Sequence, residues 1–371
     1  MMIDENKLID TFLSLVRIDA VSLRERKMRD YLSGRLVELN IEFREDDAAL
    51  KIGGECGNII ARLDSNVQSD THYLLMAHMD TVASTSALEP VVENGVIRSG
   101  GSTILGADDR AGIAVILYAL DALRSNGVKH CNVDIVFSVA EELGMLGSTE
   151  LDLSGIKARQ GYILDCSRKV GCYVRTTPTA IDFKVNLRGR SAHSGVSPEK
   201  GINAISMAVD FTRRIPVGRL DEDTVANVGT IQGGTAINVV PEHVQLTGEI
   251  RSFSRDKIIE LKRNMEDNAR VISKEMGGEI ELSYTTGFEG FLLDRSKAVI
   301  KHLEEEMRLM NIEPDPLKYY GGSDANVLNA KGIDTVNLGI GVQNPHSKDE
   351  HIEKSQLVKS AELVMRLLTL E

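Results

Sequence analysis

Groups that can bind a cation follow apolar runs of the sequence at several separate places. They are His78 and Asp80 after "YLLMA", Asp108 and Asp109 in "LGADDRAG", Glu141 and Glu142 after "VDIVFSVA", Asp165 at the end of "GYILD", and His346 after "TVNLGIG". Buried charges without a counter-charge are strongly destabilising, so carboxylates that gather in a core need cations. Imidazole and carboxylate ligands without thiolate are typical of Zn²⁺, and Mn²⁺ or Co²⁺ can replace it.

Each of these residues has a simpler interpretation when it is taken alone. Asp108 and Asp109 could only cap a helix, and Glu141 and Glu142 could only begin a solvated turn. The set as a whole favours a metal centre, because two Zn²⁺ ions balance three carboxylates and one bridging hydroxide. The HExxH motif of proteases with a single zinc is absent from the sequence.

The elements that must position these groups are continuous apolar strands that alternate with helices. We expect strands at 58–63, 72–78, 133–140, 161–166 and 335–341, and helices at 109–125 and 354–370. A further helix is expected to begin at Ser22, with Glu25 completing a capping box. This pattern predicts an α/β fold with a mostly parallel sheet and helices on both faces. Sites in such sheets form at the carboxyl ends of the strands, so the side chains should meet at one edge.

The pattern changes between residues 176 and 286, where strands alternate polar and apolar residues. Strands at 180–190, 243–250 and 279–284, with helices near 202–214 and 255–276, indicate an inserted α+β domain. We therefore expect a discontinuous catalytic domain at 1–175 and 287–371, interrupted by this insert.

Composition restricts the classes of partner and compartment. The 371 residues include 43 basic and 55 acidic ones, for a formal net charge of −12. Such a charge argues against nucleic-acid and anionic-membrane binding. No apolar stretch is long enough to span a bilayer, and no signal peptide is recognisable at the N-terminus. The cysteines at 56, 131, 166 and 172 form no disulfide framework, so we expect a cytoplasmic protein with reduced thiols.

An ordered series of motifs resembles a known family of enzymes. The motifs are "AHMDTV", "LGADDRAG", "AEELGMLGS", "YILDCS", "SAHSGVSPEKGINAI", "GTAINVVPE", "GEIRSFSRDK", "GGSDANVLNAKG" and "NPHSKDEHI". In this order they are similar to peptidase T-like members of the two-zinc aminopeptidase, carboxypeptidase and aminoacylase family. The chain departs from peptidase T in having only 25 residues, Thr81 to Leu105, between the first two motifs.

The resemblance implies a ligand for each position of a two-zinc centre. His78 and Asp165 would be terminal ligands of one ion, Glu142 and His346 of the other, and Asp108 would bridge both. Asp80 would hold His78 through its other ring nitrogen, and Glu141 would be the general base and acid that serves the bridging hydroxide.

The resemblance also assigns substrate-binding residues to the insert, as a lid and dimerisation domain. His193 would reach a substrate carbonyl across a homodimer, while Asn238 and Arg251 would hold the substrate. Asn238 could instead be a turn residue and Arg251 a solvated charge.

The leading hypothesis is an exopeptidase that removes the N-terminal residue of small peptides, of the tripeptidase type. An N-acyl-amino-acid deacylase or a carboxypeptidase would use the same centre, so the motifs leave these alternatives open. A non-catalytic binding protein on the same fold is a third hypothesis.

Overall fold

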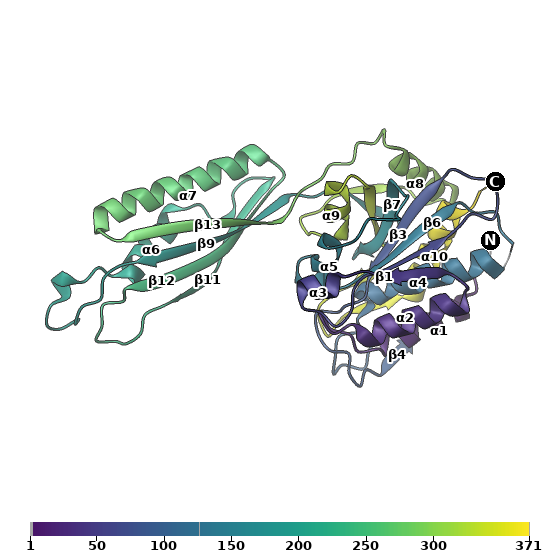
Figure 1. The fold of residues 1–371 in the computed structure, drawn as a ribbon, viewed down its shortest axis with the longest axis horizontal. Coiled ribbons are helices and arrows are strands. Elements are labelled where there is room, and N and C mark those ends of the chain that lie inside the picture. Colours follow the sequence, from purple (N-terminus) through teal and green to yellow (C-terminus); the bar gives the residue numbers. More distant parts are fainter. Residues whose placement is uncertain (1–2, 126, 371) are drawn as a thin grey trace. The chain divides into compact units, whose positions relative to one another are not determined.

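The computed structural model of the chain describes residues 3–125 and 127–370. The chain divides into two compact units, residues 1–176 with 291–371 and residues 177–290, both drawn in Figure 1. The second boundary lies beyond the predicted residue 286 because the last strand of the insert continues to Phe288, which pairs with Ala180. Among the described residues, no helix is both long and apolar enough to cross a membrane.

An eight-stranded sheet forms the centre of the larger unit. In spatial order its strands are β1 (Glu42–Glu45), β2 (Ile59–Leu63), β6 (Asn132–Ser138), β3 (His72–His78), β7 (Gln160–Cys166), β15 (Asp334–Gly339), β8 (Cys172–Thr176) and β14 (Asp315–Lys318). The four central strands, β6, β3, β7 and β15, run parallel, whereas β2 and β8 flank them in the antiparallel direction. The predicted α/β fold with a mostly parallel sheet is confirmed.

Both faces of this sheet are covered, which explains its continuous apolar strands. Successive residues of a strand point to opposite faces. Leu74 and Met76 of β3 accordingly pack in one cluster with Leu328 of α9 (Asp324–Ala330), and Leu75 and Ala77 pack in the other.

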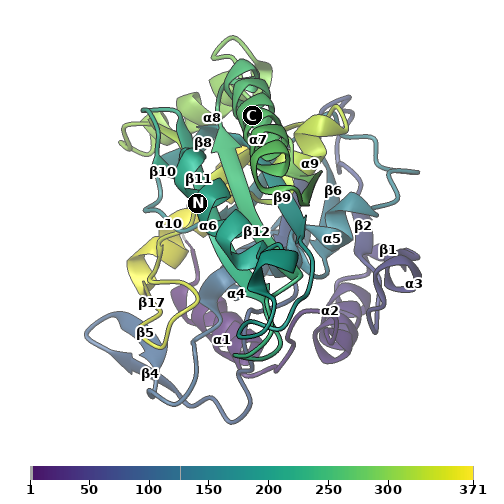
Figure 2. The same cartoon turned by 90° about the vertical axis from the view of Figure 1, so that its left-hand side faces the viewer.

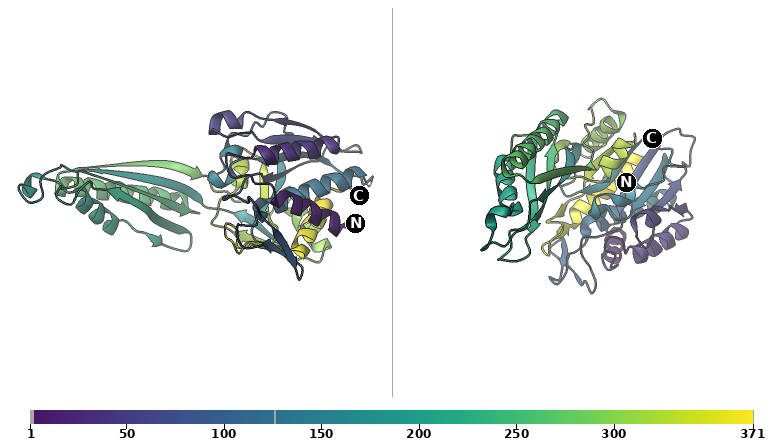
Figure 3. Two further views of the ribbon diagram at one scale, coloured as in Figure 1. Left: turned by 90° about the horizontal axis from the view of Figure 1, so that it is seen from below. Right: turned by 60° about the vertical axis from the view of Figure 1, so that its left-hand side comes forward.

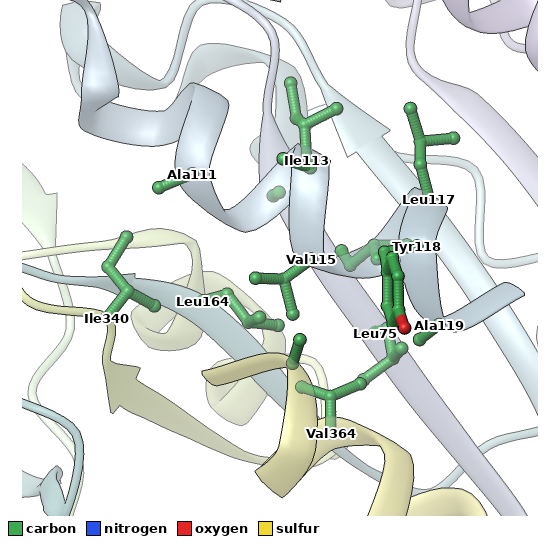
Figure 4. Close-up of a cluster of buried hydrophobic side chains, with 14 of the residues drawn as sticks. Leu75, Ala111, Ile113, Val115, Leu117, Tyr118, Ala119, Leu164, Ile340 and Val364 are labelled. Atoms are coloured by element: carbon green, nitrogen blue, oxygen red, sulfur yellow. The ribbon is translucent and has the colours of Figure 1, made fainter. Parts of the chain in front are cut away.

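Several helices contribute to the second cluster. They are α1 (Glu5–Val16), α2 (Arg26–Glu38), α4 (Ala107–Ser125), α8 (Ala298–Leu309) and α10 (Lys354–Leu368). Figure 4 shows Leu75 and Leu164 of the sheet together with Val115 of α4 and Val364 of α10. Helix α4 is buried along most of its length, so its first turn has a fixed position at the sheet edge.

The chain before α2 differs from the prediction. The expected capping box of Ser22 and Glu25 is wrong, because the helix begins at Arg26 and Glu25 makes no side-chain cap. The Ser22 hydroxyl instead donates to Asp80 Oδ2 at 2.7 Å, and the Glu25 carboxylate accepts from the Ala140 N–H at 3.0 Å. Both side chains bind segments that follow strands of the central sheet.

A small antiparallel sheet lies beside the main one and was not predicted. It consists of β16 (Val342–Gln343), β17 (His351–Glu353), β5 (Val96–Ser99) and β4 (Pro90–Glu93), and Figure 2 shows β17, β5 and β4 side by side. Strands β16 and β17 pair directly, so the loop between them has both of its ends held. That loop carries His346.

The inserted unit is a five-stranded antiparallel sheet with two helices. Its strands are, in spatial order, β10 (Gly218–Arg219), β11 (Thr224–Gly233), β12 (His243–Ser252), β9 (Thr179–Arg188) and β13 (Glu279–Phe288). Helices α6 (Ala204–Arg214) and α7 (Arg255–Met276) lie on the same face of the sheet, as Figure 3 shows. Alternate residues such as Phe183, Val185 and Leu187 pack against these helices. This is the α+β arrangement that the alternating strands predicted.

Candidate metal centre

The carboxyl ends of the central strands bring the predicted ligands together. His78 is the last residue of β3, Asp165 lies near the end of β7, Glu141 and Glu142 follow β6 in a short helical turn, Asp108 lies in the first turn of α4, and His346 lies between β16 and β17. Ligand atoms of His78, Asp108 and Glu142 lie within 4.8 Å of one another, and so do those of His78, Asp109 and Asp165.

His78 is almost completely buried and directs each ring nitrogen to different partners. Its Nε2 lies 3.1 Å from Asp108 Oδ1 and 3.7 Å from Asp165 Oδ1. Its Nδ1 lies 3.1 Å from the Asp80 carbonyl oxygen and 3.4 Å from Asp80 Oδ1. Burial lowers the pKa of His78, but these carboxylates outweigh burial and raise it well above its usual range. Nε2 is therefore the nitrogen that faces the acidic cluster.

His346 completes the cluster from the opposite side of Asp108. Its Nε2 lies 3.2 Å from Asp108 Oδ2 and 3.0 Å from Glu142 Oε1. Hydrogen bonds to these two carboxylates raise the pKa of His346 to about 10. Burial opposes ionisation of Asp108, yet His346 and His78 hold the pKa of that carboxyl below its usual range. Asp108 thus presents one oxygen to each imidazole, which suits a ligand that bridges two ions.

The residues fit a pair of divalent cations. The buried Oε1 of Glu142 faces the Nε2 of His346 at 3.0 Å, and no Lys or Arg of the described residues forms an ion pair with it. Burial raises the pKa of Asp165 to about 7, with further contributions from Asp108 and Glu142. Among the described residues no Lys or Arg pairs with these carboxylates, and divalent cations of the Zn²⁺ class, which imidazole and carboxylate ligands favour, would stabilise the cluster.

Asp109 is a less suitable ligand than its neighbour. Its carboxylate accepts hydrogen bonds from the backbone N–H groups of His78, at 3.3 Å, and of Gly112, at 3.0 Å. Burial raises the pKa of Asp109 well above its usual range. Asp109 therefore connects the start of α4 to the end of β3, which makes it a less suitable metal ligand than Asp108.

Asp80 organises two parts of the centre at once. Besides contacting His78, its carboxylate accepts from the backbone N–H groups of Glu141, at 3.0 Å, and Glu142, at 3.2 Å. Burial opposes ionisation of Asp80, but His78 and Ser22 lower its pKa below the ordinary value. One carboxylate consequently orients an imidazole and holds the turn that carries two acidic side chains.

Glu141 has the electrostatic properties of a proton acceptor. Burial, followed by the charge of Asp165, raises the pKa of Glu141 well above its usual range. A carboxyl group with a raised pKa is a stronger base than an ordinary carboxylate, which suits a group that accepts a proton. Its neighbour Glu142 faces His346 instead, so two adjacent residues of the turn have different surroundings.

Two buried carboxylates next to the centre were missed in the sequence. Glu350 is only 1% exposed, and its oxygens accept from the N–H groups of Gly106 at 2.7 Å and Asp108 at 3.0 Å. Burial raises the pKa of Glu350 to about 7. Burial, together with the charge of Asp80, also raises the pKa of Glu25 to about 7. The position of Glu350, shortly after His346 in "NPHSKDEHI", could have indicated its role.

The predicted substrate-binding residues lie in the inserted unit. His193 forms an isolated antiparallel bridge with Val239, and the neighbouring Ser194 N–H donates to the Asn238 carbonyl oxygen at 3.1 Å. His193 and Asn238 are therefore close together, and both are exposed. Arg251 of β12 forms an ion pair with Glu249 at 2.9 Å. The role of all three in substrate binding stays a prediction.

Comparisons with known proteins agree with this geometry. The model of the peptidase family M20/M25/M40 matches residues 74–370 of the chain. The uncharacterised protein YqjE of Bacillus subtilis strain 168 is 36% identical over 367 residues, which cover 99% of each chain.

Two solved structures are similar over almost their whole length. The aminopeptidase PepT from Bacillus cereus ATCC 10987 matches with a TM-score of 0.93 and 34% identity, covering 99% of each chain. A tripeptidase from Staphylococcus aureus subsp. aureus Mu50 matches with a TM-score of 0.94 and 32% identity, covering 99% of this chain and 98% of that one.

Proposed function

The chain belongs to the peptidase family M20/M25/M40, and on this premise we propose that it removes the amino-terminal residue from small peptides, tripeptides in particular, at a centre of two divalent metal ions. The resemblance to peptidase T-like enzymes that the motifs predicted is confirmed at the level of the family. Membership of a family of peptidases argues against the non-catalytic alternative.

One observation carries this proposal. Two imidazoles approach opposite oxygens of a single carboxylate, Asp108, at 3.1 and 3.2 Å. Asp165 and Glu142 supply one further carboxylate on each side. We assign His78 and Asp165 to one ion, Glu142 and His346 to the other, and Asp108 to both. Zn²⁺ is the proposed metal because two histidines and three carboxylates suit it.

When bound, the two ions supply Lewis acidity, which polarises the scissile carbonyl and makes water acidic enough to react. Glu141 accepts a proton from the attacking water while the water oxygen forms a bond to the carbonyl carbon. The C–N bond then breaks, and Glu141 returns that proton to the leaving amine nitrogen. Asp80 keeps Glu141 in position through the backbone N–H of the same residue.

The inserted unit is proposed to act as a lid and to form a homodimer. His193 would stabilise the developing oxyanion and Asn238 and Arg251 would hold the substrate, as the resemblance implies. Light scattering combined with activity measurements tests the dimer: a monomer that is fully active contradicts it. The proposed compartment is the cytoplasm, which the four free, buried cysteines support.

The decisive experiment is a panel of free and blocked peptides. The protein is stripped with a chelator, reloaded with Zn²⁺, Mn²⁺ or Co²⁺, and given dipeptides and tripeptides with free, acetylated or amidated ends. An aminopeptidase releases the amino-terminal residue from the free peptide and loses activity when the amino group is acetylated. No cleavage of any free peptide with any of the three metals would contradict the proposal.

A deacylase or a carboxypeptidase is the second candidate, because it can use the same metal centre. The same panel separates the candidates: cleavage of N-acetylated amino acids favours the deacylase, and release of the carboxy-terminal residue favours the carboxypeptidase. The solved structures similar over almost the whole chain are an aminopeptidase and a tripeptidase, which favours the first candidate.

A further inference from the structure

A hollow of about 420 Å³ opens beside the turn that follows β7. We call it the cationic hollow, and its lining includes Ser167, Arg168, Lys169, Asp315, Lys318, Tyr319 and Gln343. A volume of this size is within the usual range for small-ligand sites, roughly 300–1,000 Å³.

The charge of the cationic hollow is opposite to that of the whole chain. Arg168, Lys169 and Lys318 oppose one lining carboxylate, Asp315, so the lining carries a formal charge of 3 − 1 = +2, whereas the chain carries −12. Asp315 also accepts a hydrogen bond from the Cys172 thiol at 3.4 Å. Burial, followed by this contact, raises the pKa of Cys172 to about 11, so the thiol adds no negative charge.

The cationic hollow is connected to the proposed metal centre by main-chain hydrogen bonds. Ser167 lies two residues after the proposed ligand Asp165, and Gln343 lies three residues before His346. The N–H of Ile340 donates to the Cys166 carbonyl oxygen at 3.1 Å, and that of Gly341 donates to the Arg168 carbonyl oxygen at 2.7 Å. The segments that lead to the two ligands are thus tied together along one wall.

Tyr319 adds a hydrogen-bond donor to this wall. Burial raises the pKa of Tyr319, and its hydrogen bond with Ser167 only partly opposes the rise, so the phenol is neutral at physiological pH. Its hydrogen-bond partner Ser167 lies two residues after the proposed ligand Asp165. A protonated phenol and guanidinium and ammonium groups are all donors, a combination that suits a carboxylate.

From this arrangement we infer that the cationic hollow is a subsite for an anionic carboxylate of the peptide substrate. The inference rests on the proposed function and names the substrate class: small peptides that carry a negative charge on the carboxy-terminal side of the scissile bond. The carboxylate is either the free α-carboxylate of a short peptide or an acidic side chain. A tripeptide spans up to about 10 Å, and the Cα atoms of Ser167 and Asp165, two residues apart, are at most about 7 Å from each other, so the edge of the cationic hollow lies within one tripeptide length of a proposed ligand.

Binding is measured separately from turnover by using zinc-loaded protein with Glu141→Gln, titrated by calorimetry. The probes are trialanine against trialaninamide, and Ala-Ala-Glu-amide against Ala-Ala-Gln-amide. We expect the charged member of at least one pair to bind about tenfold more tightly than the uncharged one, the effect of a charge-assisted hydrogen bond. A preference in the first pair identifies the α-carboxylate, and a preference in the second identifies an acidic side chain.

The test variant carries Arg168→Gln and Lys169→Gln in addition to Glu141→Gln. In this variant we expect the preference for the charged peptide over the uncharged one to fall below twofold. The matched control adds Lys27→Gln and Arg124→Gln, which remove the same charge from exposed positions on α2 and α4, and should keep the preference. The inference is overturned if none of the four peptides binds, if neither pair shows a preference, or if the preference persists in the test variant. Cleavage of free tripeptides by the unsubstituted protein tests the proposed function independently of these results.

Discussion

The carboxylate of Glu350 holds the backbone of Asp108, although the two residues lie 242 positions apart in the chain. Its Oε1 accepts from the Asp108 N–H at 3.0 Å, and its Oε2 accepts from the Gly106 N–H at 2.7 Å. Glu350 lies in the same loop as His346. One buried carboxylate therefore connects the loop of a proposed terminal ligand to the segment of the proposed bridging ligand.

Replacing Glu350 should weaken metal binding without removing any ligand. Glu350→Gln cannot accept from both N–H groups, and the loss of a hydrogen bond to a charged group costs about 1.5–3 kcal/mol. We expect zinc affinity, measured by competition with a chromogenic chelator, to fall by about 10–100-fold. The matched control is Asp349→Asn, which removes an exposed neighbouring charge; equal losses in the two variants would contradict the positioning role.

Substitutions at Glu141 and at Glu142 should have different effects, the first on the rate of the chemical step and the second on the metal content. Glu141→Gln is expected to keep both metals, because the predicted ligands do not include it, and to lower kcat by about 10²–10⁴-fold. Glu142→Gln is expected to lower the metal content itself, since its Oε1 faces His346 at 3.0 Å. Elemental analysis with steady-state kinetics checks both, and normal turnover of the Glu141 variant would show that another group moves the proton.

Replacing Asp80 should impair both metal binding and turnover, because its carboxylate contacts His78 and the turn that carries Glu141. His78→Ala should lose metal, whereas Asp80→Ala should lower metal affinity by about 10–100-fold and lower kcat at saturating metal as well. Ser22→Ala removes one of the hydrogen bonds to Asp80 Oδ2 and leaves the one from the Glu142 N–H, so it should lower both quantities less than Asp80→Ala does. An Asp80 variant with unchanged kcat would mean that the turn keeps its place without this carboxylate.

Glu25 should make the stability of the metal-free protein depend on pH. Its folded-state pKa is about 7 against an ordinary value of 4.5, so between these values the unfolded chain binds fewer protons than the folded one. The free energy of unfolding therefore falls as pH rises through this window, by up to about 3 kcal/mol. Glu25→Gln should remove this loss and be more stable than the unsubstituted protein above pH 7.

Urea unfolding in a chelating buffer from pH 5 to 8.5 measures this difference. The exposed Glu89 provides the control, because Glu89→Gln should leave the pH dependence unchanged. A Glu25 variant whose stability relative to the unsubstituted protein is the same at both ends of this range would show that the buried carboxyl stays ionised in the folded state.

Local patterns were sufficient for the strand that ends in His78 and for the long helix of the inserted unit. The run 72–78 was predicted from its apolar residues and is β3 in the structure, and 255–276 was predicted from helical periodicity and is α7. Strand β11 was missed because most of its residues are exposed and show no clear alternation. The capping box at Ser22 was wrong because a distant partner, Asp80, competes for that hydroxyl.

The sequence by itself determined the central apolar strands, the main helices, the family, and the residue types at the strand ends, since periodicity and short motifs depend on neighbours along the chain. Only the tertiary structure decided which oxygens of Asp108 face His78 and His346, that Asp80 supports the turn of Glu141, and that Glu350 and Glu25 are buried beside the centre. These contacts join segments far apart in sequence, and they follow from the packing of the sheet and α4, which no local pattern encodes.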